Sequence, residues 1–261
     1  LMMDLGILGR KAIVCASSRG LGKACAKALI REGCSVVING RDPETLAEAQ
    51  KELSELQQGS VTSIAADINT AAGRSKLLES CPEPDILVNN NEGPPPGDFQ
   101  SWGEPEWRSA LEANLLAPAF MIQGAIQGMK SRGFGRIVNI TSAMVKSPHA
   151  LMGLSTAARS GLTALSKGLS GEAIAYNVTI NNLLPERFDT QRQQQMAKMM
   201  MRDQGITHAE AIEAIANTIK AKRMGRPEEF GDACAYLCSA QAGYISGQNL
   251  QLDGGSYVGL V

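Results

Sequence analysis

Short apolar runs rich in β-branched residues alternate along this chain with longer segments of helical periodicity. This alternation is the pattern of successive βαβ units, which build a parallel sheet covered on both faces. We therefore predict an α/β fold with a doubly wound parallel sheet of seven strands and helices on both faces. The expected strands are residues 11–16, 35–39, 61–66, 85–89, 136–141, 178–183 and 249–252. The expected helices are residues 20–32, 43–57, 71–80, 104–132, 153–176 and 227–239.

The alternation runs along the chain without a Gly/Ser-rich linker or a block of charge, so we expect residues 1–261 to form a single domain. One stretch, residues 189–225, departs from the rhythm and is polar and rich in methionine. Ligands of open α/β sheets bind beyond the carboxyl ends of the strands, so this insertion is a candidate substrate lid. The alternative is a pair of surface helices in which the methionines fill gaps.

The charges of the chain nearly cancel, because 25 Lys and Arg residues face 26 Asp and Glu residues for a formal net charge of −1. This balance argues against nucleic-acid binding, which needs an excess of basic residues on one face. The six cysteines form no Cys-x-x-Cys pair and only two histidines are present, so we expect no metal site. No apolar run is long enough to span a membrane and the N-terminus does not resemble a signal peptide, so the predicted location is cytoplasmic.

A glycine-containing turn at residues 16–22 follows the first predicted strand and opens a helix. Glycines there let the backbone approach a pyrophosphate at the helix N-terminus. The second strand ends near Arg41, without the carboxylate that a NAD-preferring site places against the ribose 2′-hydroxyl. Arg41 and Arg19 instead suit a 2′-phosphate, because a guanidinium group binds phosphate oxygens with two parallel hydrogen bonds. The sequence thus favours NADP(H) over NAD(H).

The order of the motifs resembles the short-chain dehydrogenase/reductase family, and most closely its 3-oxoacyl-carrier-protein reductase-like branch, over nearly the whole chain. Residues 16–22 are similar to the family's glycine turn, residues 87–90 to the start of its N-N-A-G motif, and residues 185–190 to P-G-x-x-x-T. The resemblance implies a Rossmann-like fold, and it implies catalytic roles for Asn114 and Ser142. The cofactor-binding residues that it implies are Ala16, Ser18, Arg19, Gly20, Leu21, Gly22, Asn39, Arg41, Asp67, Ile68, Asn89, Asn90, Pro185 and Thr190.

The chain departs from the family at the residues that carry its proton chemistry. The family places a tyrosine acid thirteen residues after the serine and a lysine four residues further on, where this chain has Ser155 and Arg159. A serine hydroxyl is a poor proton donor near neutral pH, whereas an arginine still supplies positive charge and can hold the nicotinamide ribose. His149 is a candidate replacement acid, because imidazole donates a proton at neutral pH. The alternative is an incidental, exposed loop histidine.

Three glycines of the family pattern are also replaced, by Ala16, Glu92 and Glu186. Ala16 is acceptable if its φ is negative. The two glutamates would lie near the pyrophosphate and the nicotinamide, where like charge would repel an anionic dinucleotide. Gly93 can restore the second turn by a shift of one residue.

We therefore expect an NADP(H)-dependent oxidoreductase that acts on a small carbonyl or alcohol at an atypical catalytic site. Its residues would be Ser142, Asn114, Ser155, Arg159 and His149. Two alternatives stay open: a catalytically silent NADP-binding or scaffold protein, and a non-redox enzyme on the same fold, such as the halohydrin dehalogenases. The substrate pocket is expected between residues 93–99, 143–152 and 189–225, loops in which no charged anchor stands out. The resemblance also implies a homotetramer formed through residues 104–132 and 153–176.

Overall fold

A computed structural model describes residues 4–260. Seven parallel strands form one sheet in the order β3-β2-β1-β4-β5-β6-β7. The order reverses between β1 and β4, which is the point where open α/β sheets bind their ligands. The doubly wound parallel sheet predicted from the sequence is confirmed. The strands are β1 (Lys11–Val14), β2 (Ser35–Gly40), β3 (Ser60–Ala65), β4 (Ile86–Asn89), β5 (Gly135–Ile140), β6 (Val178–Pro185) and β7 (Asn249–Leu252).

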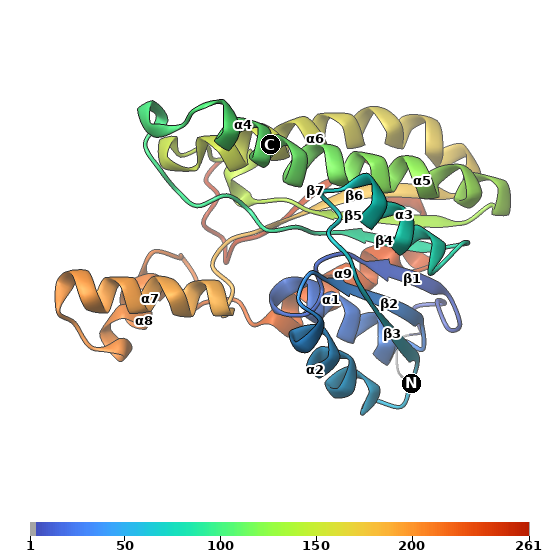
Figure 1. Ribbon diagram of the computed structural model, residues 1–261, viewed down its shortest axis with the longest axis horizontal. Helices are drawn as coiled ribbons and strands as arrows, with labels where there is room; N and C mark the ends of the chain where they lie inside the picture. Colours follow the sequence, from blue (N-terminus) through green and yellow to red (C-terminus); the bar gives the residue numbers. More distant parts are fainter. Residues whose placement is uncertain (1–3, 261) are drawn as a thin grey trace.

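Helices cover both faces of this sheet (Figure 1). Successive side chains of β1 point to opposite layers, since Ala12 and Val14 pack with the first layer and Ile13 with the second. Both faces are therefore buried, which explains why the strands read as unbroken apolar runs. The first layer contains α1 (Gly20–Arg31), α2 (Pro43–Ser54) and α9 (Pro227–Cys238), and the second α3 (Ala71–Glu79), α5 (Ala117–Arg132) and α6 (Gly153–Ala173).

The helix predicted over residues 104–132 contains an irregular turn. It consists of α4 (Glu104–Leu111), a π-helical turn (Glu112–Leu116) and α5. Pro118 has no backbone N–H, so the α-helical hydrogen bond to the carbonyl of Asn114 cannot form. Single π-turns inside helices often occur at functional sites. This one carries the buried Asn114 side chain.

Residues 189–225 form a helical hairpin that projects from the rest of the molecule (Figure 1, orange). Its helices are α7 (Gln191–Gln204) and α8 (His208–Asn217). Ala197, Ala211 and Ile215 are buried between them, and methionines such as Met196 and Met200 pack against these residues. The methionines thus give the hairpin a small apolar core of its own.

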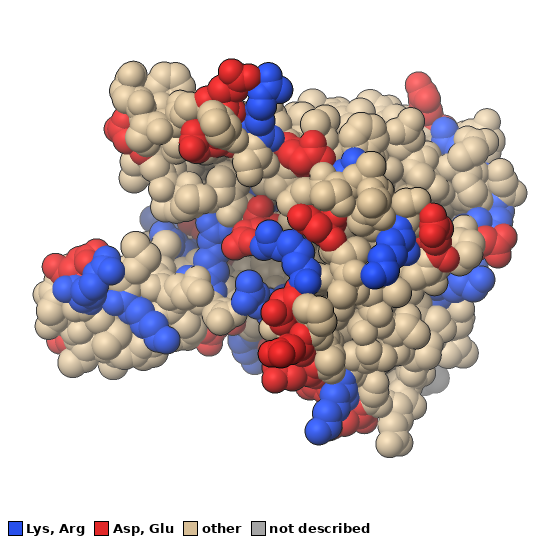
Figure 2. Space-filling view, in the orientation of Figure 1, with Lys and Arg blue, Asp and Glu red and all other residues tan. Residues whose placement is uncertain are grey.

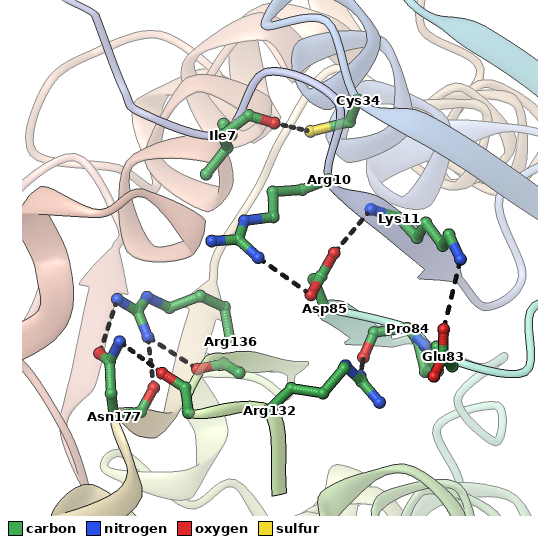
Figure 3. Close-up of polar contacts among 12 residues, drawn as sticks. Ile7, Arg10, Lys11, Cys34, Glu83, Pro84, Asp85, Arg132, Arg136 and Asn177 are labelled. Carbon is green, nitrogen blue, oxygen red and sulfur yellow. Dashed lines mark hydrogen bonds and ion pairs between the residues drawn. The ribbon is translucent and has the colours of Figure 1, made fainter. Parts of the chain in front are cut away.

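Polar contacts tie the strands together at the edge of the sheet where β1, β4 and β5 begin (Figure 3). Arg10 donates to Asp85 over 3.2 Å. Arg136, only 1% exposed, donates to the carbonyl and the side-chain oxygen of Asn177 over 2.9 and 3.2 Å. Its guanidinium also lies 4.3 Å from the centre of the Phe134 ring. These groups stabilise the amino ends of the strands, whereas the predicted site residues lie at the carboxyl ends.

Candidate active site

The turn between β1 and α1 has open space on one side and a tight contact on the other. Gly20 has a φ of +59°, and a Cβ there would meet no atom within 4 Å. A Cβ on Gly22 would lie 2.8 Å from Asn90 Nδ2 and would collide with the carbonyl oxygen of Ala16. Glycine is therefore required at Gly22 for packing, and the turn brings α1 against the residues that follow β4.

Ala16 corrects one expectation, because its φ is +44° rather than negative. The left-handed region costs a residue with a Cβ about 1–2 kcal/mol. Two hydrogen bonds hold the residue there: its N–H donates to Asn39 Oδ1 over 3.2 Å, and its carbonyl accepts from Asn90 Nδ2 over 3.0 Å. The chain thus keeps a backbone shape that glycine would adopt without strain.

The N-terminus of α1 has no side-chain cap. Arg19 is the N-cap residue, and its guanidinium donates to Gln191 Oε1 over 3.3 Å rather than capping the helix. The first N–H groups of α1 are therefore free to bind an anion, with the helix dipole favouring negative charge. Together with the open face of Gly20, these N–H groups fit the pyrophosphate of a dinucleotide.

The residues after β2 present positive charge rather than a free carboxylate. Arg41 forms an exposed ion pair with Glu92, with 2.6 Å between Nη2 and Oε2. The neighbouring Asp42 is used as the N-cap of α2, where it accepts from the Thr45 N–H over 2.7 Å. Hydrogen bonding to Thr45 lowers the pKa of the Asp42 carboxyl. Arg41 is thus positioned to release the Glu92 carboxylate and bind the 2′-phosphate of NADP(H) in its place.

The other residues predicted near the adenosine already use some of their hydrogen-bonding groups within the protein. Asn39 is 1% exposed, and its Nδ2 donates to the carbonyls of Ile64 and Ala66 at 3.1 and 3.0 Å. Asp67 Oδ1 accepts from a backbone N–H two residues on, over 3.0 Å, and Ile68 is buried in the core. Asn39 therefore joins β2, β3 and the glycine turn.

A row of buried amides crosses the sheet and was not predicted from the sequence. Asn89 donates to Asn139 Oδ1 over 2.9 Å, and Asn139 donates to Asn182 Oδ1 and to Ser166 Oγ, both over 2.9 Å. The three asparagines occupy paired registers of β4, β5 and β6. Their shared register was the available signal, but reading it requires knowing which strands are neighbours. A satisfied network of this kind fixes the strand ends rigidly.

Ser155 and Arg159 lie one turn apart on α6 and are in contact. Arg159 Nε donates to Ser155 Oγ over 3.1 Å, and Nη1 donates to the carbonyls of Ile140 and Thr141 over 2.8 and 2.7 Å. Burial, with Arg192 nearby, lowers the pKa of Arg159 to about 10, so the guanidinium is cationic at neutral pH. No carboxylate within residues 4–260 forms an ion pair with it. The result is a buried cation beside a serine hydroxyl.

A small pocket opens beside Arg159 at the carboxyl ends of β4 and β5. Its walls include Asn90, Asn91 and Ile140, together with Asn114 from the π-turn. Asn114 Nδ2 lies 3.3 Å from the carbonyl oxygen of Glu92. The pocket therefore brings together two of the predicted catalytic residues, Asn114 and Arg159.

Ser142 and His149 lie outside the walls of this pocket. Ser142 follows β5 closely, and its Oγ accepts from the Met144 N–H over 3.2 Å, which leaves the hydroxyl proton free to donate. His149 is exposed, and its Nδ1 accepts from the Leu151 N–H over 3.3 Å. Its neutral ring therefore carries the proton on Nε2. Within the described chain, the His149 ring makes no hydrogen bond to either serine.

A charged side chain from residues 189–225 reaches the site, although the sequence offered no charged anchor. A Cβ on Gly93 would lie 3.2 Å from Arg159 Nη2, 3.3 Å from Arg192 Nη1 and 3.8 Å from Ser155 Oγ. Figure 2 shows Lys and Arg side chains at the inner end of the hollow beside the α7–α8 hairpin. Arg192 was missed because it lies in a glutamine-rich turn with no motif around it.

The remaining predicted residues lie after β6. Pro185 is the last residue of β6 and pairs in register with Leu252 of β7. Glu186 is partly buried, and burial raises the pKa of its carboxyl. Thr190 is the N-cap residue of α7, but its hydroxyl makes no capping hydrogen bond and is free for a ligand.

Comparison with known proteins places the chain in a family. Residues 15–257 match the family model described as Enoyl-(Acyl carrier protein) reductase. The NADPH-dependent reductase BacG of Bacillus subtilis is 33% identical over 252 residues, which cover 95% of this chain and 97% of BacG. The chain belongs to the short-chain dehydrogenase/reductase family. The predicted family is thereby confirmed.

Other members of the short-chain dehydrogenase/reductase family are similar over the same length. The 3-oxoacyl-[acyl-carrier-protein] reductase FabG of Vibrio harveyi is 27% identical, with 97% of this chain and 100% of FabG covered. The structure of L-sorbose reductase from Gluconobacter frateurii, complexed with NADPH and L-sorbose, superimposes with a TM-score of 0.94. That protein is 28% identical, and 99% of this chain and 100% of the reductase chain are covered. The protein is thus an oxidoreductase of the nicotinamide-dependent dehydrogenase/reductase type. Within residues 4–260, no helix is both long enough and apolar enough to cross a membrane.

Proposed function

We propose that this protein is an NADP(H)-dependent oxidoreductase that interconverts a small carbonyl compound and its alcohol at a site built around Arg159 and Ser155. The observation that carries the proposal is the buried Arg159 cation, which contacts the Ser155 hydroxyl beside a pocket at the carboxyl ends of β4 and β5. NADP(H) is the cofactor. BacG and the L-sorbose reductase structure support it by their names, and Arg19 and Arg41 support it by their chemistry.

The cofactor would be held by the N–H groups of α1, by the turn of Ser18, Arg19, Gly20, Leu21 and Gly22, and by Arg41 at the 2′-phosphate. Asp67 and Ile68 would flank the adenine, and Asn90, Pro185 and Thr190 the nicotinamide side, by resemblance to the family. When bound, the nicotinamide supplies the hydride that reduces the carbonyl carbon. The protein orients both partners and provides the proton for the carbonyl oxygen.

Arg159 and the serines would act on the substrate oxygen. Ser142 has a free hydroxyl proton with which to hydrogen-bond the carbonyl. The Arg159 guanidinium stabilises the negative charge that develops on this oxygen, and does so strongly because it is buried. The proton reaches the oxygen from the Ser155 hydroxyl, from a water held by Asn114, or from His149. In this proposal Ser155 and Arg159 replace the tyrosine and lysine usual in the family.

The α7–α8 hairpin is proposed to act as the substrate lid. Arg192 supports this role, because it extends from the first turn of α7 to the same space as Arg159. A homotetramer formed through α4, α5 and α6 remains a proposal based on resemblance, and the cytoplasmic location remains a prediction. Light scattering at micromolar concentration checks the tetramer.

The test of the proposed function is NADPH consumption with a panel of small aldehydes, ketones and oxo acids. The proposal expects turnover that Ser155→Ala reduces and that Thr156→Val, the adjacent substitution on α6, does not. Bound NADPH with no turnover of any carbonyl would instead favour a catalytically silent protein. That alternative gains further if Ser155→Tyr combined with Arg159→Lys creates activity that the natural chain lacks.

A further inference from the structure

Two arginines converge on one point next to Gly93. Arg159 Nη2 and Arg192 Nη1 lie 3.2 and 3.3 Å from the position of a Cβ on this glycine, so the two guanidinium groups are near neighbours. Like charges this close repel each other, most strongly where water is excluded. Arg192 is exposed, so water weakens this repulsion, and an anion bound between the two groups would replace the repulsion by attraction to both.

The Arg159 guanidinium is fixed by hydrogen bonds from two of its three nitrogens. Its Nε and Nη1 donate to Ser155, Ile140 and Thr141, whereas Nη2 has no acceptor within residues 4–260. The residue is 8% exposed and lines the pocket, and Nη2 is not one of the fully buried unpartnered atoms of the described chain. Nη2 is therefore a cationic donor that a ligand entering the pocket can reach.

Arg192 is not held by the fold. No carboxylate among the described residues pairs with it, and its side chain makes no hydrogen bond there. Nearby arginines behave differently: Arg41 pairs with Glu92, and Arg187 donates to Gln193 Oε1 over 3.4 Å. Arg192 thus points an unpaired guanidinium at the space that Arg159 Nη2 and Ser155 Oγ also face.

We propose that Arg192, with Arg159, binds a carboxylate of the substrate, and that the enzyme reduces oxo acids whose carboxylate is directly attached to the carbonyl carbon. This inference rests on the proposed function. The carbonyl oxygen would lie at Ser155 and Arg159, and the carboxylate would bridge to Arg192. The substrate's carbonyl and carboxylate must be close together to reach these residues at the same time. Arg159 Nη2, Arg192 Nη1 and Ser155 Oγ all lie within 3.8 Å of one point, the position of a Cβ on Gly93.

Gly93 leaves room for this anion. Any larger residue would place a Cβ at contact distance from both guanidinium groups. The glycine therefore keeps a charged recess open between the loop after β4 and the first turn of α7. A phosphate of the cofactor has the same anionic chemistry as a carboxylate, so the experiment must separate the two.

The experiment compares four substrates in NADPH oxidation: the six-carbon α-oxo acid, the ethyl ester of that acid, the six-carbon δ-oxo acid and the six-carbon methyl ketone. We expect a kcat/KM for the α-oxo acid at least about tenfold above the other three. Arg192→Met should abolish this preference by lowering kcat/KM for the α-oxo acid toward that for the methyl ketone measured with the same variant, and Arg192→Lys should restore part of it. Lys198→Met, an exposed charge on the same helix, is the matched control and should change nothing. Equal rates for all four substrates would overturn the inference.

Calorimetry distinguishes a substrate carboxylate from a cofactor phosphate as the anion. It also tests the carboxylate site separately from the proposed reaction. If Arg192→Met weakens NADPH binding about tenfold and leaves the substrate preference intact, the anion is a cofactor phosphate and the inference is wrong. If no carbonyl is reduced, the unreactive carboxylate oxamate is titrated into the NADP⁺ complex. Binding that Arg192→Met abolishes supports the carboxylate site although the proposed reaction has failed. Absence of oxamate binding overturns the carboxylate site.

Discussion

Arg41 and Glu92 form an ion pair of 2.6 Å that joins the end of β2 to the loop after β4. The two residues were expected to act in opposite directions, Arg41 attracting a 2′-phosphate and Glu92 repelling the dinucleotide. The structure shows them neutralising each other instead. Both side chains are more than half exposed, so the pair contributes at most about 1 kcal/mol and is easily exchanged for a phosphate.

Glu92→Gln should tighten NADPH binding about three- to tenfold, because it frees Arg41 and removes a negative charge near the pyrophosphate. NADH has no 2′-phosphate and should gain less, so the preference for NADPH should rise. Titration calorimetry with both cofactors measures this. Glu104→Gln removes a more exposed ion pair, with Arg108 on α4, and is the control. An unchanged ratio of the two affinities would show that Arg41 does not read the phosphate.

Ser155→Ala should lower kcat/KM for carbonyl reduction about a hundredfold, because it removes both a hydroxyl at the site and the acceptor of Arg159 Nε. Steady-state NADPH oxidation is the measurement. Thr156→Val is a matched control on α6, since the buried Thr156 hydroxyl has no hydrogen-bond partner within residues 4–260. Equal activity of Ser155→Ala and the natural chain would show that Ser155 has no catalytic role.

Ala16→Gly should stabilise the protein by about 0.5–1 kcal/mol. The φ of +44° is strained for alanine and free for glycine, and this gain exceeds the entropy that glycine loses on folding. Urea unfolding followed by circular dichroism gives the free energy of unfolding. Ala26→Gly, in the interior of α1, should instead destabilise the protein by about 1 kcal/mol or more. A lower free energy of unfolding for Ala16→Gly would show that the backbone at Ala16 is not strained.

Glu186 should make cofactor binding depend on pH. Burial raises the pKa of this carboxyl, so the folded protein binds the proton more tightly than the unfolded chain does. The associated stability is present at low pH and is lost as the pH rises through the raised pKa. Protonation also removes a negative charge near the dinucleotide, so affinity for NAD⁺ should rise as the pH falls from neutral through the raised pKa of this carboxyl.

The control for this pH dependence is Glu186→Gln, which mimics the protonated side chain. Its NAD⁺ affinity should be higher at neutral pH and should lose the pH dependence. NAD⁺ is chosen because the 2′-phosphate of NADP⁺ would itself titrate. If the pH dependence persists in Glu186→Gln, another titrating group causes it and the prediction for Glu186 is wrong.

The sequence predicted the fold well because burial on both sides of a parallel sheet leaves a strong pattern. Each expected strand is present with ends displaced by at most two residues. The first strand ends earlier than expected, at Val14, because Ala16 turns the backbone into the left-handed region. Local propensity does not reveal that conformation, which depends on two hydrogen bonds to distant residues, one donated by Ala16 to Asn39 and one accepted by Ala16 from Asn90.

The candidate site was less predictable, because its geometry depends on contacts between distant segments. The contact of Ser155 with Arg159 follows from their spacing on one helix. The approach of Arg192 to Arg159 depends on how the α7–α8 hairpin is attached, and no motif marks it. The ion pair of Arg41 with Glu92 likewise depends on the strand order, in which β1 alone lies between β2 and β4.

Titration calorimetry of the purified protein with NADPH and, separately, NADH tests the central claim most directly, because every proposed step requires the dinucleotide at the turn between β1 and α1. The account predicts micromolar binding of NADPH, with NADH at least about tenfold weaker. Binding of neither cofactor would contradict it, since it would mean that Glu92 and Glu186 close the site and that the redox function must be abandoned.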